Sequence, residues 1–142
     1  MQKLNSDEII IREMIKDDIE RLIQIEKEQN ISISSITALT DSFNESTSFY
    51  YVAIYNRQII GYFGIDIIDD FVDILSIVVK KDFQNIGIGK LLLNEILKIA
   101  KKNNIQKIFL EVRKSNIIAQ NLYGSFNFKL INTRKNYYPD NL

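Results

Sequence analysis

The sequence predicts a single α/β domain in which the strands of one sheet alternate with helices. Three observations support this fold class. The chain has 142 residues, the size of one ordinary domain. Its composition, 46% hydrophobic and 25% charged, is typical of a soluble globular protein. Apolar patterns of strand length and of helix period alternate without a linker, so we treat residues 1–142 as one domain.

The first part of the chain predicts a short strand and a helix. Ile9–Ile11 is an apolar run of strand length. Lys16–Asn30 carries apolar residues on one helical face and acidic residues near its start, where the helix dipole favours anions. Residues 31–44 are rich in Ser and Thr, which predicts a loop with a short helix.

Three consecutive strands are predicted next, at Ser48–Tyr55, Gln58–Ile68 and Phe71–Val79. The first two are separated only by Asn56-Arg57, which indicates a tight hairpin.

The last part returns to alternating helices and strands. The clearest helix covers Ile88–Asn103, because its Leu and Ile residues recur on one face. A strand at Lys107–Arg113, a helix at Ser115–Phe126 and a strand at Phe128–Arg134 complete the predicted order.

Composition excludes several kinds of chemistry. The chain contains no Cys and no His, which rules out disulfides, thiolate nucleophiles, Ser-His-Asp triads and sites with Cys or His metal ligands. Proton transfer therefore falls to carboxylates, Tyr, Lys, Arg or water. No apolar run approaches the roughly 18–20 residues of a membrane span, and residues 1–10 lack the apolar core of a signal peptide. We expect a cytoplasmic protein that does not bind a membrane.

The formal net charge of zero conceals two oppositely charged halves. Residues 1–79 contain 6 Lys and Arg against 14 Asp and Glu, and residues 80–142 contain 12 against 4. The second half therefore suits an anionic ligand and the first a cationic one. Uneven surface charge without function is the alternative. The basic residues form no dense run, so we expect no direct contact with nucleic acid.

A glycine-containing segment precedes the clearest helix. Residues 84–89 have the sequence Gln-Asn-Ile-Gly-Ile-Gly. Glycines allow close approach of the backbone to a ligand, and the free N–H groups at a helix start favour phosphate. The spacing fits neither a P-loop, because Leu91 follows Lys90, nor a dinucleotide fingerprint, because Leu92 replaces its third glycine. A plain strand-to-helix turn remains the alternative.

Three further polar residues are candidates for chemistry. Glu111 lies in an apolar strand, where desolvation raises a carboxyl pKa and strengthens a base; a salt bridge to Arg113 is the alternative. The Tyr123 phenol suits protonation of a leaving thiolate, although a core Tyr would have the same spacing. Asn116 is either a ligand-binding residue or a helix cap.

Two segments resemble the GNAT N-acetyltransferases. Ser76-Ile77-Val78-Val79, followed by residues 84–90, resembles the acetyl-CoA motif of that family. Residues 110–116, Leu122-Tyr123 and the Asn-Tyr-Tyr-Pro of residues 136–139 resemble its RimI-type members, which acetylate the N-terminal alanine of a ribosomal protein. The resemblance is strong over residues 74–139 and loose over residues 1–70.

The resemblance implies a mixed, mostly antiparallel sheet that splays between two strands and binds acetyl-CoA there. Backbone groups of Ile77, Val78 and Val79 would bind the pantetheine arm, and the Val79 N–H would also face the oxyanion. The pyrophosphate would lie on the N–H groups of Asn85, Ile86, Gly87, Ile88, Gly89 and Lys90. Asn116 would bind coenzyme A through its side chain.

The same resemblance assigns the proton transfers and implies a direct reaction without a metal. Glu111 corresponds to the general base that deprotonates the amine, and Tyr123 to the general acid that protonates the thiolate. The implied acceptor is a basic protein N-terminus, attracted to the acidic residues of the first half. Another amine, such as a polyamine, an aminoglycoside or a lysine, remains an alternative acceptor. Acetyl-CoA binding without turnover is the alternative from another class.

Two departures from the family pattern lead to further expectations. Asn127-Phe128 replaces the usual Gly-Phe. The family continues past Tyr-Tyr-Pro into a further strand, whereas this chain ends at Leu142. We therefore expect the final edge strand to be missing and the uncovered Phe128–Arg134 strand to promote self-association.

Overall fold

A computed structural model describes residues 6–29, 48–111, 128–130 and 136–139 of the chain. The described helices and strands, in chain order, are the 3₁₀ turn η1 (Ser6–Glu8), β1 (Ile10–Glu13), η2 (Lys16–Asp18), α1 (Ile19–Glu28), β2 (Ser48–Tyr55), β3 (Gln58–Ile68), β4 (Phe71–Val79), η3 (Lys81–Phe83), α3 (Ile88–Lys102), β5 (Lys107–Glu111), β6 (Phe128–Leu130) and β7 (Asn136–Pro139). No helix in these ranges is long and apolar enough to cross a membrane.

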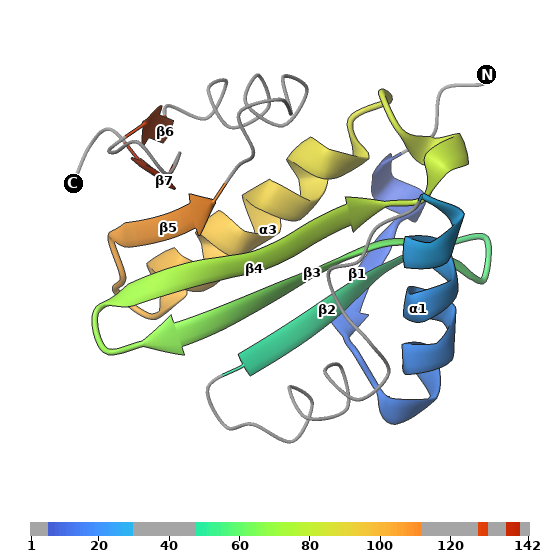
Figure 1. The fold of residues 1–142 in the computed structure, drawn as a ribbon, viewed down its shortest axis with the longest axis horizontal. Helices are drawn as coiled ribbons and strands as arrows, with labels where there is room; N and C mark the ends of the chain where they lie inside the picture. The colour runs from blue at the N-terminus through green and yellow to red at the C-terminus, as the bar shows by residue number, and fades with distance from the viewer. Residues whose placement is uncertain (1–5, 30–47, 112–127, 131–135, 140–142) are drawn as a thin grey trace.

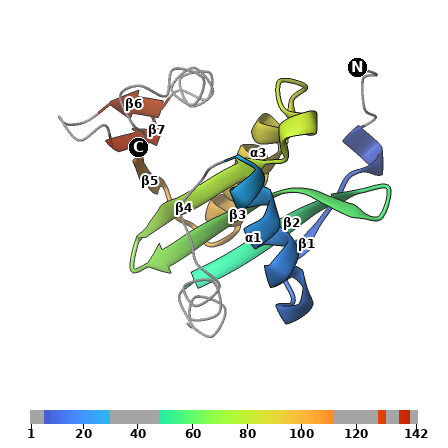
Figure 2. The same cartoon turned by 45° about the vertical axis from the view of Figure 1, so that its right-hand side comes forward.

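One sheet organises the described strands, in the order β1-β2-β3-β4-β5-β7-β6 (Figure 1). Neighbouring strands are antiparallel except β4 and β5, which run parallel. Helix α1 covers one face and α3 the other, as the turned view shows (Figure 2). The predicted α/β class and the mixed, mostly antiparallel sheet are thereby confirmed.

The central hairpins begin and end at the predicted residues. β2, β3 and β4 have the predicted bounds, and the two turn residues Asn56 and Arg57 both adopt positive φ, at 51° and 66°. Two positive φ values in a two-residue turn are typical of a type I′ hairpin, whose twist matches that of the strands. The predicted loop at 31–44 and helix at Ser115–Phe126 lie outside the described residues.

The C-terminal strand differs from expectation. We expected Phe128–Arg134 to be the last strand and a strand beyond Tyr-Tyr-Pro to be missing. Residues 140–142 lie outside the described residues, but the Asn-Tyr-Tyr-Pro segment itself, Asn136–Pro139, forms β7 and pairs with both β5 and β6. A four-residue strand that ends in proline carries no alternating apolar pattern, so the sequence offered no strand signal there. β7 covers one side of β6, so the backbone groups on that side are not free to pair with another chain. The self-association prediction assumed that they were free.

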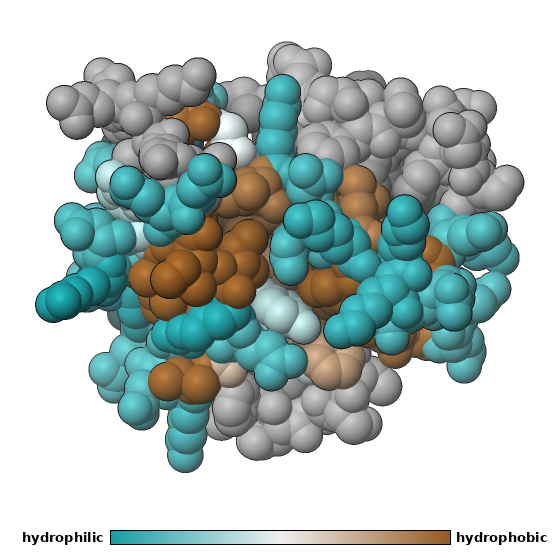
Figure 3. Space-filling view, turned by 180° about the vertical axis from the view of Figure 1, so that it is seen from behind, coloured by the Kyte–Doolittle hydropathy of each residue, from teal (hydrophilic) through white to brown (hydrophobic). Residues whose placement is uncertain are grey.

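Two apolar clusters hold the helices on the sheet. On one face, Leu92, Leu93 and Ile96 of α3 pack with Phe63 and Ile65 of β3. On the other face, Leu22 and Ile25 of α1 join a cluster from the same sheet. Seen from the α3 side, apolar surface remains visible between hydrophilic side chains (Figure 3). Side chains that alternate along each strand thus supply both cores.

A β-bulge interrupts the register of β4. Gly64 lies opposite Ser76 but its neighbour Ile65 lies opposite Ile74, so Leu75 is an extra residue in β4. The bulge exchanges the two faces of the strand: Val72 and Ile74 pack on the α3 side before it, and Val78 packs on the α1 side after it. A bulge bends its strand and increases the local twist, so β4 changes direction at this point.

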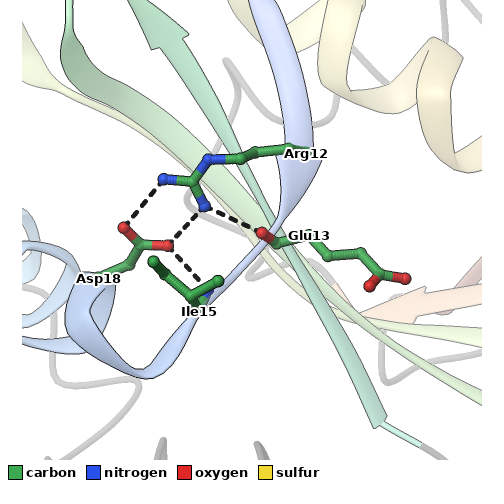
Figure 4. A network of polar contacts seen from close by, with 4 residues as sticks. All are labelled: Arg12, Glu13, Ile15 and Asp18. Carbon is green, nitrogen blue, oxygen red and sulfur yellow. Dashed lines mark hydrogen bonds and ion pairs between the residues drawn. The ribbon is translucent and has the colours of Figure 1, made fainter.

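The start of α1 is held to β1 by one carboxylate (Figure 4). Asp18 accepts hydrogen bonds from both terminal nitrogens of Arg12, at 2.8 and 3.2 Å, and from the backbone N–H of Ile15 at 2.8 Å. Burial favours the neutral form of this carboxyl, but the bonds from Arg12 and Ile15 and the Arg12 charge outweigh it, so the pKa of Asp18 is lowered. The ionised form therefore stabilises the turn into α1.

The stabilisation from Asp18 should be lost in acid. A lowered pKa in the folded state contributes stability above the ordinary aspartate pKa of 3.8, and this contribution disappears as the pH falls through the lower folded value. We expect Asp18→Asn to lower the free energy of unfolding by roughly 1 kcal/mol at pH 7 and by less at pH 2. Urea unfolding at both pH values measures this; Asp17→Asn, at an exposed neighbour, is the control. An equal loss at both pH values would contradict the assignment.

A buried carboxylate connects α1 to the middle of the sheet. Glu26 is only 1% exposed, and its Oε2 accepts a hydrogen bond from the Tyr62 hydroxyl of β3. Its other oxygen, Oε1, is buried and has no hydrogen-bond partner among the described residues. Burial first, and the bond to Glu26 second, raise the pKa of Tyr62 far above its ordinary value, so the phenol remains a donor.

Removing the phenol should therefore be costly. Tyr62→Phe leaves both oxygens of Glu26 without a donor, and an unsatisfied buried group costs roughly 1–3 kcal/mol. We expect that loss in the free energy of unfolding, measured by chemical denaturation. Tyr55→Phe, on the half-buried Tyr55 of β2, should change it by less than about 0.5 kcal/mol. If both variants unfold like the wild type, the Tyr62–Glu26 bond contributes nothing to stability.

Candidate active site

The two parallel strands separate at the bulge and leave an open edge. β4 pairs with β5 from Phe71 to Ile74, opposite Lys107 to Leu110. Beyond Ile74, the described part of the chain provides no partner for β4 on this side. β5 continues to Glu111, whose backbone pairs with Asn136 of β7. Within the described part of the chain, Leu75–Val79 is therefore an unpaired edge of β4, and we call the space that it faces, beyond the last β4–β5 pair, the opening between β4 and β5.

Hydrogen-bond alternation decides which backbone groups face this opening. The Lys80 N–H donates to the Ile60 carbonyl at 2.8 Å, so that pair is a hydrogen-bonded one. In antiparallel strands such pairs alternate, which directs the backbone groups of Val78 towards Tyr62 on β3. The N–H and C=O groups of Ile77 and Val79 then point the other way, into the opening. Of the three residues expected to bind pantetheine, two present backbone groups there.

The segment after β4 leads into an uncapped helix start. Gly87 is the N-cap of α3 with φ at 98°, and no side chain caps the helix. The first bond of the helix is Leu91 N–H to Gly87 C=O, at 3.1 Å. The N–H groups of residues 88–90 precede it and have no acceptor within the helix. Together with exposed Lys90, they form a suitable site for an anion.

The two residues with positive φ give this turn its shape. Asn85 adopts φ of 64°, and a Cβ added at Gly87 would have no other group of the described residues within 4 Å. The space over Gly87 is thus open to a ligand, and a larger residue would project into it.

A small groove of about 180 Å³ lies beside the helix start, lined by Ile9, Ile86, Gly87, Ile88, Lys90, Leu91 and Asn94. It is smaller than the roughly 300–1,000 Å³ of ordinary ligand pockets, so it would hold no more than part of a coenzyme.

The predicted site residues are brought together in part. Residues 77–79 end β4, and residues 85–90 form the turn and first residues of α3 that follow it. The backbone of Glu111 lies at the end of β5, one residue beyond the Ile74–Leu110 pair where the strands part. Asn116 and Tyr123 lie outside the described residues. Sequence reasoning missed the Leu75 bulge, for which no pattern in the sequence provides a signal.

Comparison with known proteins decides the family. Residues 16–128 match the model of the Acetyltransferase (GNAT) family. The chain belongs to this family. The resemblance inferred from the sequence is therefore confirmed, and with it the expectation that the chain uses acetyl-CoA.

Individual relatives agree with this assignment. The chain is 34% identical over 130 residues to the [ribosomal protein bS18]-alanine N-acetyltransferase of Haemophilus influenzae, covering 92% of this chain and 88% of that protein. A putative enzyme of the same name from Bacillus subtilis is 30% identical, over 92% of this chain and 87% of that protein. The protein is thus an acetyl-CoA-dependent N-acetyltransferase.

Solved GNAT structures share the fold. The Escherichia coli ribosomal-protein-S18-alanine N-acetyltransferase superimposes with a TM-score of 0.80 at 20% identity, over 94% of this chain and 98% of that one. The PaiA N-acetyltransferase of Thermoplasma acidophilum, solved with coenzyme A, gives 0.81 at 24% identity, over 92% and 96%. At these identities the likeness concerns the fold.

Gly87 provides a direct test of the coenzyme site. Gly87→Val should weaken coenzyme A binding ten-fold or more, because the side chain would fill the open space over the helix start. Calorimetry with coenzyme A measures the Kd. Asn104→Val is a matched control, since Asn104 also has positive φ, at 58°, but lies beyond the other end of α3. Both variants should lose roughly 1–2 kcal/mol of stability to backbone strain. A folded Gly87→Val protein with unchanged Kd would exclude this turn from the site.

Proposed function

We propose that this N-acetyltransferase acts on the N-terminal α-amine of a protein that begins with alanine. The observation that carries this proposal is the similarity to two bS18-alanine N-acetyltransferases over 92% of the chain. The unpaired edge of β4 in the described residues and the start of α3, which no described side chain caps, support the binding of acetyl-CoA that this reaction requires.

The backbone directions refine the proposed contacts with acetyl-CoA. The groups of Ile77 and the N–H of Val79 are available along the open edge, whereas Val78 bonds to β3 and acts by shaping the strand. The N–H groups of residues 85–90 would hold the pyrophosphate, and Asn116 would add a side-chain contact. The Val79 N–H would in addition stabilise the oxyanion of the tetrahedral intermediate.

The proposed reaction is direct attack of the amine on the thioester carbonyl. Glu111 removes the proton from the ammonium, directly or through a water molecule, and the free amine forms the new C–N bond. The tetrahedral intermediate collapses with cleavage of the C–S bond, and Tyr123 gives its proton to the departing thiolate. The second proton of the attacking amine leaves the nitrogen as the amide forms and restores the Tyr123 phenol. Neither a metal nor a covalent acyl-enzyme takes part in this scheme. Coenzyme A and an acetylated amine are the products.

The charge of the sheet face supports a basic acceptor. Side chains of the residues Ser48, Asp66, Asp73 and Phe109 share a row across β2, β3, β4 and β5. Two carboxylates are therefore directly opposite each other on β3 and β4, which favours a nearby cation. In the next row, the hydroxyl of buried Ser76 has no hydrogen-bond partner within the part of the chain that the structure describes. A basic peptide would be steered to this face, with modest gain in affinity.

A substitution at Glu111 distinguishes its proposed role as the general base from a purely structural role. Glu111→Gln keeps the shape of the side chain but removes its basicity, and general-base catalysis is worth roughly 10²–10⁴-fold. We expect a loss of that order in kcat/KM at neutral pH, partly relieved at high pH where free amine is abundant. Coenzyme A affinity should change little. Overlapping pH–rate profiles of the two proteins on one alanine-ended peptide would exclude Glu111 as the base.

The acceptor is tested with a panel of amines. Release of free coenzyme A should be fastest with a basic peptide that begins with alanine. Blocking the N-terminus of that peptide removes the proposed acceptor amine and should slow the release. Spermidine or an aminoglycoside should also give slower release than the unblocked peptide. Preference for a polyamine, an aminoglycoside or a lysine side chain would replace the proposed acceptor with another amine. Binding of acetyl-CoA without turnover on any amine would favour a sensor.

A further inference from the structure

Two glutamine side chains meet at the last carbonyl of β4. Gln29, the C-cap of α1, donates from Nε2 to the Val79 carbonyl at 2.7 Å. Gln84, at the start of the turn before α3, donates from its own Nε2 to the same carbonyl at 3.0 Å and to Gln29 Oε1 at 2.9 Å. Three segments that lie up to 55 positions apart in the sequence thus share one small hydrogen-bonded cluster.

This cluster fixes the residue next to the coenzyme site. A carbonyl oxygen has two lone pairs, so two donors leave the Val79 C=O with little capacity for a ligand. They also hold the Val79 residue in place, and the Val79 N–H faces the opening between β4 and β5. Through Gln84, the same bonds position the first residue of the turn that presents residues 85–90.

Gln29 can hold the end of β4 in place because α1, the helix that it ends, is itself fixed to the sheet. The start of α1 is held by the Arg12–Asp18 pair, and its middle by Leu22, Ile25 and the Glu26–Tyr62 bond. Its half-buried side chain then reaches β4 from a rigid support. A helix-capping role alone would not require a bond to Val79, since the Gln29 backbone N–H already bonds to Glu26 C=O at 3.1 Å.

We propose that Gln29 is a positioning residue for acetyl-CoA. It touches no substrate; it acts through the Val79 carbonyl and Gln84 to hold the end of β4 and the following turn in the shape that binds coenzyme A. This inference rests on the proposed placement of coenzyme A beside Val79 and residues 85–90.

A double-mutant cycle tests the inference in the full chain. Gln29→Ala should raise the Kd for coenzyme A and the KM for acetyl-CoA roughly three- to ten-fold, the equivalent of about one hydrogen bond. The KM for the peptide should stay unchanged. Gln84→Ala should have a similar effect, and the double variant should be no worse than the weaker-binding single one, because both residues act on one carbonyl. Gln24→Ala, at an exposed position of α1, is the matched control and should bind normally.

Gln29→Glu separates the two bonds of this side chain. It retains an acceptor for Gln84 but no donor for Val79, so it should bind coenzyme A as weakly as Gln29→Ala. Additive losses in the double variant would overturn the inference. So would a Gln29→Ala protein that loses thermal stability while its Kd for coenzyme A stays normal.

Amide hydrogen exchange provides a measurement without any ligand. Gln29→Ala should speed amide exchange in residues 80–90 relative to both wild type and Gln24→Ala, because the hydrogen bonds that connect this turn to α1 are then lost. Unchanged exchange there would overturn the inference even if the wild type binds coenzyme A. A wild-type protein that binds no coenzyme A would instead overturn the proposed placement of the coenzyme, and calorimetry on the wild type shows this separately.

Discussion

The divergence of β4 from β5 is the constraint on which the rest of the site depends. Parallel pairing ends at Ile74 and Leu110, and the extra residue Leu75 follows at once. When a strand pairs with its neighbour along only half of its length, the unpaired backbone N–H and C=O groups normally form hydrogen bonds with water. In the described part of the chain, these are the groups that we propose bind acetyl-CoA. One inserted residue thus converts the centre of a sheet into an edge without removing β4 from the fold.

The two helices keep this inner edge from closing. α3 packs on one face through Leu92, Leu93 and Ile96, and α1 on the other through Leu22 and Ile25. Each helix also ends or starts beside the end of β4: Gln29 closes α1, and Gly87 opens α3. The apolar cores therefore determine the distance between the coenzyme turn and the open strand, and a few polar contacts determine its fine geometry.

The parts that sequence reasoning predicted were those with local signals. The hairpins of β2, β3 and β4 follow from their apolar runs and from the Asn56-Arg57 turn, and the α3 start from a glycine that precedes a periodic apolar stretch. The resemblance to the GNAT family added the expectation that this turn binds the pyrophosphate of acetyl-CoA. The Leu75 bulge was missed because it depends on the register between strands, which the β4 sequence alone does not specify. Gln29 and β7 were missed because a single glutamine and a four-residue strand have no periodicity to detect.

The chain order of the sheet has a consequence for how the protein folds. β1 to β4 are joined largely by antiparallel neighbours, and the β2–β3 and β3–β4 hairpins form through contacts close in sequence. The β4–β5 pair is different, because 27 residues that include α3 separate Val79 from Lys107 along the chain. Pairing across such a crossover has a larger loop-closure cost and is intrinsically slower than hairpin formation. The order of assembly then runs from the hairpins to the crossover, so β4 and β5, the two strands between which we propose that acetyl-CoA binds, meet late in folding.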